Sequence, residues 1–167
     1  GADMKTIGIQ KTKAMKQKAL EINPDCKIEI LDGFVTEKNL DHFLKDVDFA
    51  LDSIDFFCLD IKRKYFKRAQ QLNIPLMTAG PIGFGTAFLI FLPNGMTYDQ
   101  YFNVSDKTSY LDHVGSFYAA LCPKSLQKAY VQYEKKEVIE QKKPGSSIAG
   151  VNAASAAVVV IAVGDND

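Results

Sequence analysis

Hydrophobic and polar positions follow two different periods along residues 1–92. Apolar residues recur at helical spacing in 11–22 and 57–72, which predicts two helices, and a short helix is expected after Thr36, its predicted N-cap. Short apolar segments predict strands at 26–31, 47–51, 75–79 and 87–92. Because strands and helices alternate through short connections, the pattern predicts an α/β fold with a mostly parallel sheet flanked by helices.

The helix predicted at residues 57–72 has the most regular apolar stripe. The stripe consists of Phe57, Ile61, Tyr65, Ala69 and Leu72. Most of the basic residues of this segment fall outside it: Lys62, Arg63, Lys64, Lys67 and Arg68. A phosphate- or RNA-binding patch is one interpretation of these charges. Acidic residues nearby balance them, so we expect a solvated helix face.

The alternation ends at Pro93. A turn at Asn94-Gly95 leads into a segment rich in aromatic residues, and a helix is predicted at residues 110–121. Further along, residues 135–143 predict a polar loop and residues 148–163 a helix of small residues. No repeat or sharp linker divides the chain, so we expect one domain over residues 1–163 and a tail at 164–167.

Composition and charge narrow the classes of protein. The net charge is zero, from 20 basic and 20 acidic residues, which argues against a general nucleic-acid binder because neutralising phosphates needs a basic surplus. The apolar run at residues 148–163 is shorter than the roughly 20 residues that span a bilayer. The three cysteines are widely separated and favour reduced thiols. We therefore expect a cytoplasmic protein without a membrane span.

Two acidic residues follow a buried strand. Asp52 and Asp55 lie where an α/β sheet gathers its functional groups, at the carboxyl end of a strand. Carboxylates there can hold Mg²⁺, shared with the phosphates of a substrate. One of them can instead cap the following helix. For Asp55 the spacing leaves both roles open, whereas for Asp52 it favours a capping or surface role.

A glycine-rich segment, Gly80-Pro-Ile-Gly-Phe-Gly85, precedes the last predicted strand. A dinucleotide-binding loop needs a helix after its glycines, so we expect a structural turn with positive φ angles. Lys11 at the start of a helix is one lysine among several. Cys122 has no paired His or acid nearby, and His42 and His113 are too isolated to indicate zinc.

The order of these segments resembles the ThiF/MoeB family, whose Rossmann-like fold is shared by ubiquitin-activating enzymes. The resemblance is carried by an ordered series of segments: Gly8-Ile-Gln-Lys11, Ile22-Asn-Pro24, Phe34-Val-Thr36, Asn39-Leu40, Val47-Asp48, Leu51-Asp-Ser-Ile-Asp55, Ile74-Pro-Leu-Met-Thr78, the stretch from Gly80 to Thr97, and Pro144-Gly-Ser-Ser147. The stretch from Gly80 to Thr97 resembles a little-characterised bacterial subgroup of ThiF-like proteins. The resemblance as a whole extends over about residues 1–163.

The resemblance implies a function and a site. Family members bind ATP with Mg²⁺ and adenylate a carboxylate, usually the C-terminus of a ubiquitin-like or sulfur-carrier protein, and many are homodimers. It implies that Lys11 contacts the triphosphate and that Asp55 holds Mg²⁺ and the leaving pyrophosphate. We expect Lys11, Asp52 and Asp55 to bind the nucleotide and Asp55 to bind the metal. The sequence adds a second reason for a dimer, a concentration of large apolar residues: Met96, Tyr98, Tyr101, Phe102, Phe117 and Tyr118.

The sequence also departs from the family pattern. The glycine-rich nucleotide loop and the asparagine–arginine motif are expected upstream of Gly1, so we interpret the chain as an N-terminally truncated domain without its first βαβ unit. Phe56 stands where an asparagine often follows the aspartate, and the paired C-x-x-C motifs of a structural zinc site are absent. A catalytically inert dimerisation or docking module is therefore an alternative function, and an ordinary cofactor-binding α/β domain is a third.

Overall fold

The computed structural model describes residues 3–82 and 85–129. The chain divides into two units, residues 1–34 and 35–167, and each unit is described by itself. The predicted loop at 135–143 and the predicted helix at 148–163 lie outside the described residues. No helix within the described ranges is long and apolar enough to cross a membrane.

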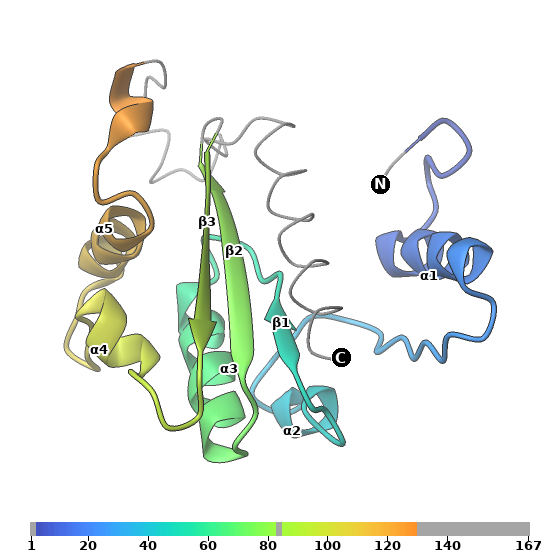
Figure 1. The fold of residues 1–167 in the computed structure, drawn as a ribbon, viewed down its shortest axis with the longest axis horizontal. Coiled ribbons are helices and arrows are strands. Elements are labelled where there is room, and N and C mark those ends of the chain that lie inside the picture. Colours follow the sequence, from blue (N-terminus) through green and yellow to red (C-terminus); the bar gives the residue numbers. More distant parts are fainter. Residues whose placement is uncertain (1–2, 83–84, 130–167) are drawn as a thin grey trace, which may run out of the picture. The chain divides into compact units, whose positions relative to one another are not determined.

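The first unit contains helix α1 (Lys11–Ile22), which has the predicted bounds (Figure 1). Asn23 ends it in an extended conformation, with its N–H bonded to Ala19 O. The strand predicted at 26–31 is wrong: these residues form no strand. A strand needs a hydrogen-bonded neighbour, and the described part of this unit supplies none. The Ile28 carbonyl instead accepts a hydrogen bond of 2.6 Å from Lys16 Nζ.

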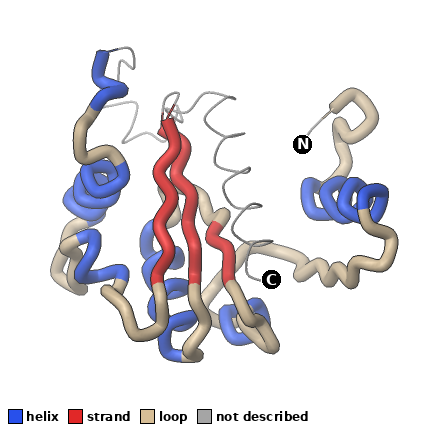
Figure 2. Tube along the Cα trace, viewed as in Figure 1, coloured by secondary structure: helices blue, strands red, loops and turns tan. Residues whose placement is uncertain are grey.

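The second unit is built on a three-stranded sheet of order β1 (Ala50–Asp52), β2 (Leu76–Ile82) and β3 (Gly85–Phe91) (Figure 2). The expected α/β class is confirmed. The sheet is mixed, because β1 and β2 pair in parallel through a helical crossover, whereas β2 and β3 pair antiparallel. The connection between β2 and β3 is too short for a crossover, which needs a dozen residues or more.

Within the described residues the second unit has five helical segments, one before β1, one between β1 and β2, and three after β3. They are α2 (Leu40–Phe43), α3 (Leu59–Gln71), α4 (Tyr98–Phe102), α5 (Tyr110–Leu121) and the 3₁₀ turn η1 (Leu126–Ala129). The bounds of α5 are those predicted, since Ser109 caps its first turn by accepting from Asp112 N. Thr36 is not an N-cap: α2 begins at Leu40, and the side chain of Asn39 accepts from Thr36 N. The strand expected at 47–51 starts later, at Ala50, and includes Asp52.

The core lies between the sheet and helices α3, α4 and α5. Buried side chains from all of these elements form it, among them Leu59, Phe66, Ala69, Leu76, Phe102, Phe117 and Leu121. The predicted stripe of α3 holds at Tyr65 and Ala69, which are buried, but Leu72 is partly exposed. Of the residues that suggested a dimer, Tyr98, Phe102 and Phe117 are core: their rings lie within 6.5 Å of one another and they are at most 3% exposed. Met96 and Tyr101 are 58% and 36% exposed, so the dimer stays a prediction.

Most of the glycine-rich segment belongs to the paired strands, because Gly80 to Ile82 end β2 and Gly85 begins β3, and no helix follows it. The two residues between the strands, where a turn was expected, lie outside the described residues. The expected positive φ angles are absent from Gly80 and Gly85, the two glycines of this segment within the described residues. A Cβ at Gly80 would lie 2.8 Å from Leu121 Cδ1, so the Leu121 side chain of α5 packs directly against the β2 backbone and would have to shift to admit a larger residue.

Candidate functional site

The candidate site is the turn that leaves β1, residues 52–55. Asp52 and Thr78 are paired neighbours on the parallel strands β1 and β2, and Thr78 Oγ1 donates to Asp52 Oδ2 at 2.7 Å. The other carboxylate oxygen, Asp52 Oδ1, accepts from Ile54 N at 3.0 Å. The sequence favoured a capping or surface role for Asp52, and the structure corrects this, because the Asp52 side chain is 0% exposed.

A third residue completes this network from α3. Lys62 Nζ donates to Asp52 Oδ2 at 2.5 Å and to the Ile54 carbonyl at 2.8 Å. The Lys62 side chain is only 4% exposed, so its expected place on the solvated face of α3 is wrong. Lys62 lies on the same helical face as Leu59, Phe66 and Ala69, and this face covers the sheet. A buried carboxylate at the end of β1 supplies the partner that the lysine needs.

Asp55 differs from Asp52 in its exposure and in its hydrogen bonds, the two properties that decide whether a carboxylate can bind a ligand. It is exposed, and its Oδ1 accepts from Phe57 N at 3.1 Å, which closes a tight turn ahead of α3. Within the described part of the chain its second oxygen, Oδ2, has no hydrogen-bond partner. Mg²⁺ often takes one or two protein carboxylates and completes its shell with water and phosphate oxygens. Asp55 fits such a site, whereas both oxygens of Asp52 are already engaged by protein groups.

Lys11 is the first residue of α1 and belongs to the first unit. Its side chain is exposed, and the first turn of α1 contains no acidic residue. The N-cap residue Gln10 makes no side-chain hydrogen bond to the helix. Unsatisfied N–H groups and a lysine at a helix N-terminus favour an anion such as phosphate. That Lys11 and Asp55 serve one site stays a prediction, as does a direct contact of Asp52 with a nucleotide.

The remaining basic residues of α3 are mostly paired with acids, as expected for a solvated face. Arg63 binds Asp99 in a bidentate pair at 2.6 Å and Asp106 at 2.8 Å. The hydrogen bonds between Arg63 and Asp99 raise the pKa of the guanidinium and lower the pKa of the carboxyl.

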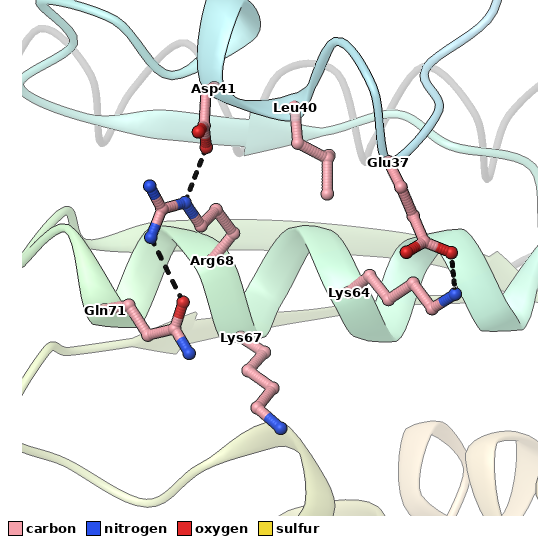
Figure 3. Close-up of a pocket in the computed structure, with 7 residues that line it drawn as sticks. All are labelled: Glu37, Leu40, Asp41, Lys64, Lys67, Arg68 and Gln71. Carbon is pink, nitrogen blue, oxygen red and sulfur yellow. Dashed lines mark hydrogen bonds and ion pairs between the residues drawn. The ribbon is translucent and has the colours of Figure 1, made fainter.

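A groove of about 310 Å³ lies between α3 and the segment at α2 (Figure 3). Lys64 pairs with Glu37 across it, and Arg68 Nε donates to Asp41 at 2.6 Å. Within this groove, then, two of the cations are neutralised by the facing acids. The paired charges do not form a phosphate-binding surface.

A second buried polar pair lies away from the turn. The Tyr98 hydroxyl and His113 Nε2 share a hydrogen bond of 3.0 Å inside the aromatic core. Burial raises the pKa of Tyr98 and lowers that of His113 below its usual range. The lowered pKa keeps the imidazole of His113 neutral near pH 7, and its hydrogen bond to Tyr98 makes it part of the core.

Comparison with known proteins identifies the family. The model of the ThiF family matches residues 1–163. The chain belongs to the ThiF family. This confirms the resemblance expected from the order of the sequence segments, and it places Asp55 and the neighbouring turn in a ThiF domain whose α/β class the structure shows.

Similar ThiF-family proteins include three bacterial tRNA threonylcarbamoyladenosine dehydratases. The protein of Haemophilus influenzae (strain ATCC 51907 / DSM 11121 / KW20 / Rd) is 37% identical over 79 residues, which are 47% of this chain and 30% of that protein. Those of Bacillus subtilis (strain 168) and Escherichia coli (strain K12) are 30% and 28% identical over 77 and 78 residues, each 46% of this chain. The match spans 28–30% of the length of these curated relatives.

Sequence reasoning missed two members of the turn network, Lys62 and Thr78. A signal for Lys62 was present, because it interrupts the spacing Leu59, Phe66 and Ala69 at the position where a fourth apolar residue would stand. A charged residue on such a face is rarely buried without a partner, and the partner lies ten positions earlier, at Asp52.

Proposed function

We propose that this ThiF domain takes part in the ATP-dependent activation of a carboxylate, by forming an acyl adenylate and releasing pyrophosphate. Family membership supports this chemistry. The observation that carries it to particular residues is Asp55, an exposed carboxylate held in a defined turn at the carboxyl end of β1. In α/β sheets this end of the strands is where ligands bind.

The proposed roles of the residues follow from charge. Attack of a carboxylate on the α-phosphate builds negative charge on the phosphate oxygens and on the leaving pyrophosphate. Lys11 would bind the triphosphate, and Asp55 would hold Mg²⁺, which supplies positive charge to the same oxygens. Asp52 would contribute by holding the turn through its hydrogen bonds, since its side chain is buried.

The proposed substrate is taken from the similar proteins. The zero net charge of the chain gives no independent support for a nucleic acid. A threonylcarbamoyl group, named for the similar dehydratases, carries a carboxylate that must be activated before water can leave. We therefore propose a tRNA carboxylate as the first substrate to test. The C-terminus of a ubiquitin-like or sulfur-carrier protein, which the family resemblance implies, is the second. A homodimer and a cytoplasmic location complete the proposal.

Isotope exchange between pyrophosphate and ATP tests the reaction in the full-length protein. Exchange that requires added tRNA carrying threonylcarbamoyladenosine, and not unmodified tRNA, supports the proposal with its first substrate. Exchange that requires a small carrier protein supports the second substrate. If neither induces exchange although ATP binds, the proposed activation is wrong and a binding module becomes the better interpretation.

A further inference from the structure

The turn before Asp55 is held by a charge that the proposed chemistry does not use. Lys62 Nζ lies 2.5 Å from Asp52 Oδ2 and 2.8 Å from the carbonyl oxygen of Ile54. Its aliphatic stem crosses the core, and its ammonium lies 5.7 Å from the centre of the Phe117 ring. Two acceptors and an aromatic face thus surround the ammonium group, and 4% of the side chain is exposed. Lys62 is therefore badly placed to touch a phosphate itself.

The main-chain N–H and C=O of Ile54 both form hydrogen bonds with the Lys62–Asp52 pair. Ile54 N donates to Asp52 Oδ1 at 3.0 Å, and Ile54 O accepts from Lys62. The Ile54 carbonyl belongs to the peptide bond that leads directly into Asp55, so its orientation sets where Asp55 begins. On the other side, Asp55 O accepts from Cys58 N at 3.0 Å and Asp55 Oδ1 accepts from Phe57 N at 3.1 Å. Asp55 is fixed from both directions while its carboxylate stays exposed.

Packing alone does not require a charge at position 62. A methionine would fill a similar volume on the face that Leu59 and Phe66 share, and with a neutral residue at position 52 as well no charge would have to leave water. What the ammonium adds is the bond to the Ile54 carbonyl, which no apolar side chain can make. The buried pair therefore stabilises one conformation of the turn.

We propose that Lys62 is a positioning residue that, with Asp52, fixes the turn 52–55 so that Asp55 presents its carboxylate in the geometry that binds Mg²⁺. This inference rests on the proposed function for the role of Asp55. Its structural part, the fixing of the turn, is independent of any nucleotide.

The test uses the full-length protein and three variants. Lys62→Met removes the anchor, and Asp52→Asn/Lys62→Met removes both buried charges, so the fold no longer contains an unpaired ion. Lys64→Met is the matched control, since it removes a lysine two positions along α3 whose side chain is 49% exposed. If Lys62→Met fails to fold, the double variant carries the test.

The first readout is amide hydrogen exchange at Ile54 and Phe57, whose N–H groups close the turn on either side of Asp55. We expect exchange at both to accelerate at least about tenfold in the double variant, relative to the core amides of β2, and to stay unchanged in Lys64→Met. Unchanged protection at both amides would overturn the inference.

The second readout is the Mg²⁺ concentration that half-saturates pyrophosphate exchange. We expect it to rise about tenfold or more in the double variant, even where unfolding measurements show wild-type stability. A core role alone would lower the active fraction without moving this concentration, so wild-type Mg²⁺ dependence in a stable double variant overturns the role of Lys62. If the wild-type protein shows no exchange at all, the proposed function fails, and the amide measurement still decides whether Lys62 fixes the turn.

Discussion

Removing one charge of the Lys62–Asp52 pair should destabilise the chain far more than removing both. Lys62→Met leaves the Asp52 carboxylate fully buried, with bonds from Thr78 and Ile54 N but without a counter-charge. Asp52→Asn leaves an ammonium group buried beside a neutral amide. In Asp52→Asn/Lys62→Met both charges are gone. An asparagine can pair with the hydroxyl of Thr78, while its neutral oxygen accepts from Ile54 N more weakly than the carboxylate does.

The magnitude follows from burial. The two side chains are 4% and 0% exposed, so water screens neither charge. Breaking such a pair costs about 3 to 5 kcal/mol, whereas replacing it by neutral groups of similar shape is often close to neutral. We expect each single variant to lose about 3 to 5 kcal/mol and the double variant to lie within about 1 kcal/mol of wild type. The exposed control Lys64→Met should change stability by less than about 0.5 kcal/mol.

Urea unfolding followed by circular dichroism measures these differences. With a slope of about 2 kcal/mol per molar, each single variant should lower the midpoint by about 1.5 to 2.5 M. Single variants within about 1 kcal/mol of wild type would contradict the burial of the pair. A double variant as unstable as the sum of the two single variants would show that Lys62 and Asp52 are not coupled.

Two further predictions concern the core and its pH dependence. Because burial lowers the pKa of His113 in the folded chain, the unfolded chain binds the proton first as pH falls below about 6.5, so this residue should weaken folding on acidification. His113→Gln should flatten the dependence of the urea midpoint between about pH 7.5 and 5.5, and an unchanged slope would refute the assignment. The second prediction compares two neighbouring aromatic residues. Phe102 is 1% exposed, so Phe102→Ala should lower the free energy of unfolding by about 3 to 5 kcal/mol. Tyr101 is 36% exposed, so Tyr101→Ala should lower it by less than about 1.5 kcal/mol. Equal losses in those two urea titrations would be inconsistent with the described packing.

Periodicity predicted the elements whose local signals agree with their packing. α5 has its predicted bounds because Ser109 caps its first turn. α1 also has its predicted bounds, and it ends at Asn23, directly before a proline, although no side chain caps its first turn. The segment at 26–31 alternates like a strand, but alternation cannot supply the neighbouring strand that a ladder needs. The apolar pattern of β3 also could not predict that it pairs antiparallel with β2, because the direction depends on the length of the connection and not on the strand itself.

The candidate site shows the same division. Asp55 could be singled out from its place after a buried strand, and the structure finds it exposed at that strand end. Lys62 was missed although it lies on the spacing of Leu59, Phe66 and Ala69, because a lysine among basic neighbours has the local appearance of a solvated residue. Its burial depends on Asp52, a partner on another element, and only the fold brings the two together.

Pyrophosphate–ATP exchange by the full-length protein and its site variants tests the central claim most directly. The variants are Asp55→Asn and Lys11→Ala, with Asp60→Asn and Lys13→Ala as controls of the same charge on nearby exposed positions. Loss of one electrostatic stabiliser should lower exchange by at least about 10²-fold in each site variant, and each control should stay within about threefold of wild type. Near-normal exchange in both Asp55→Asn and Lys11→Ala would contradict the proposed site.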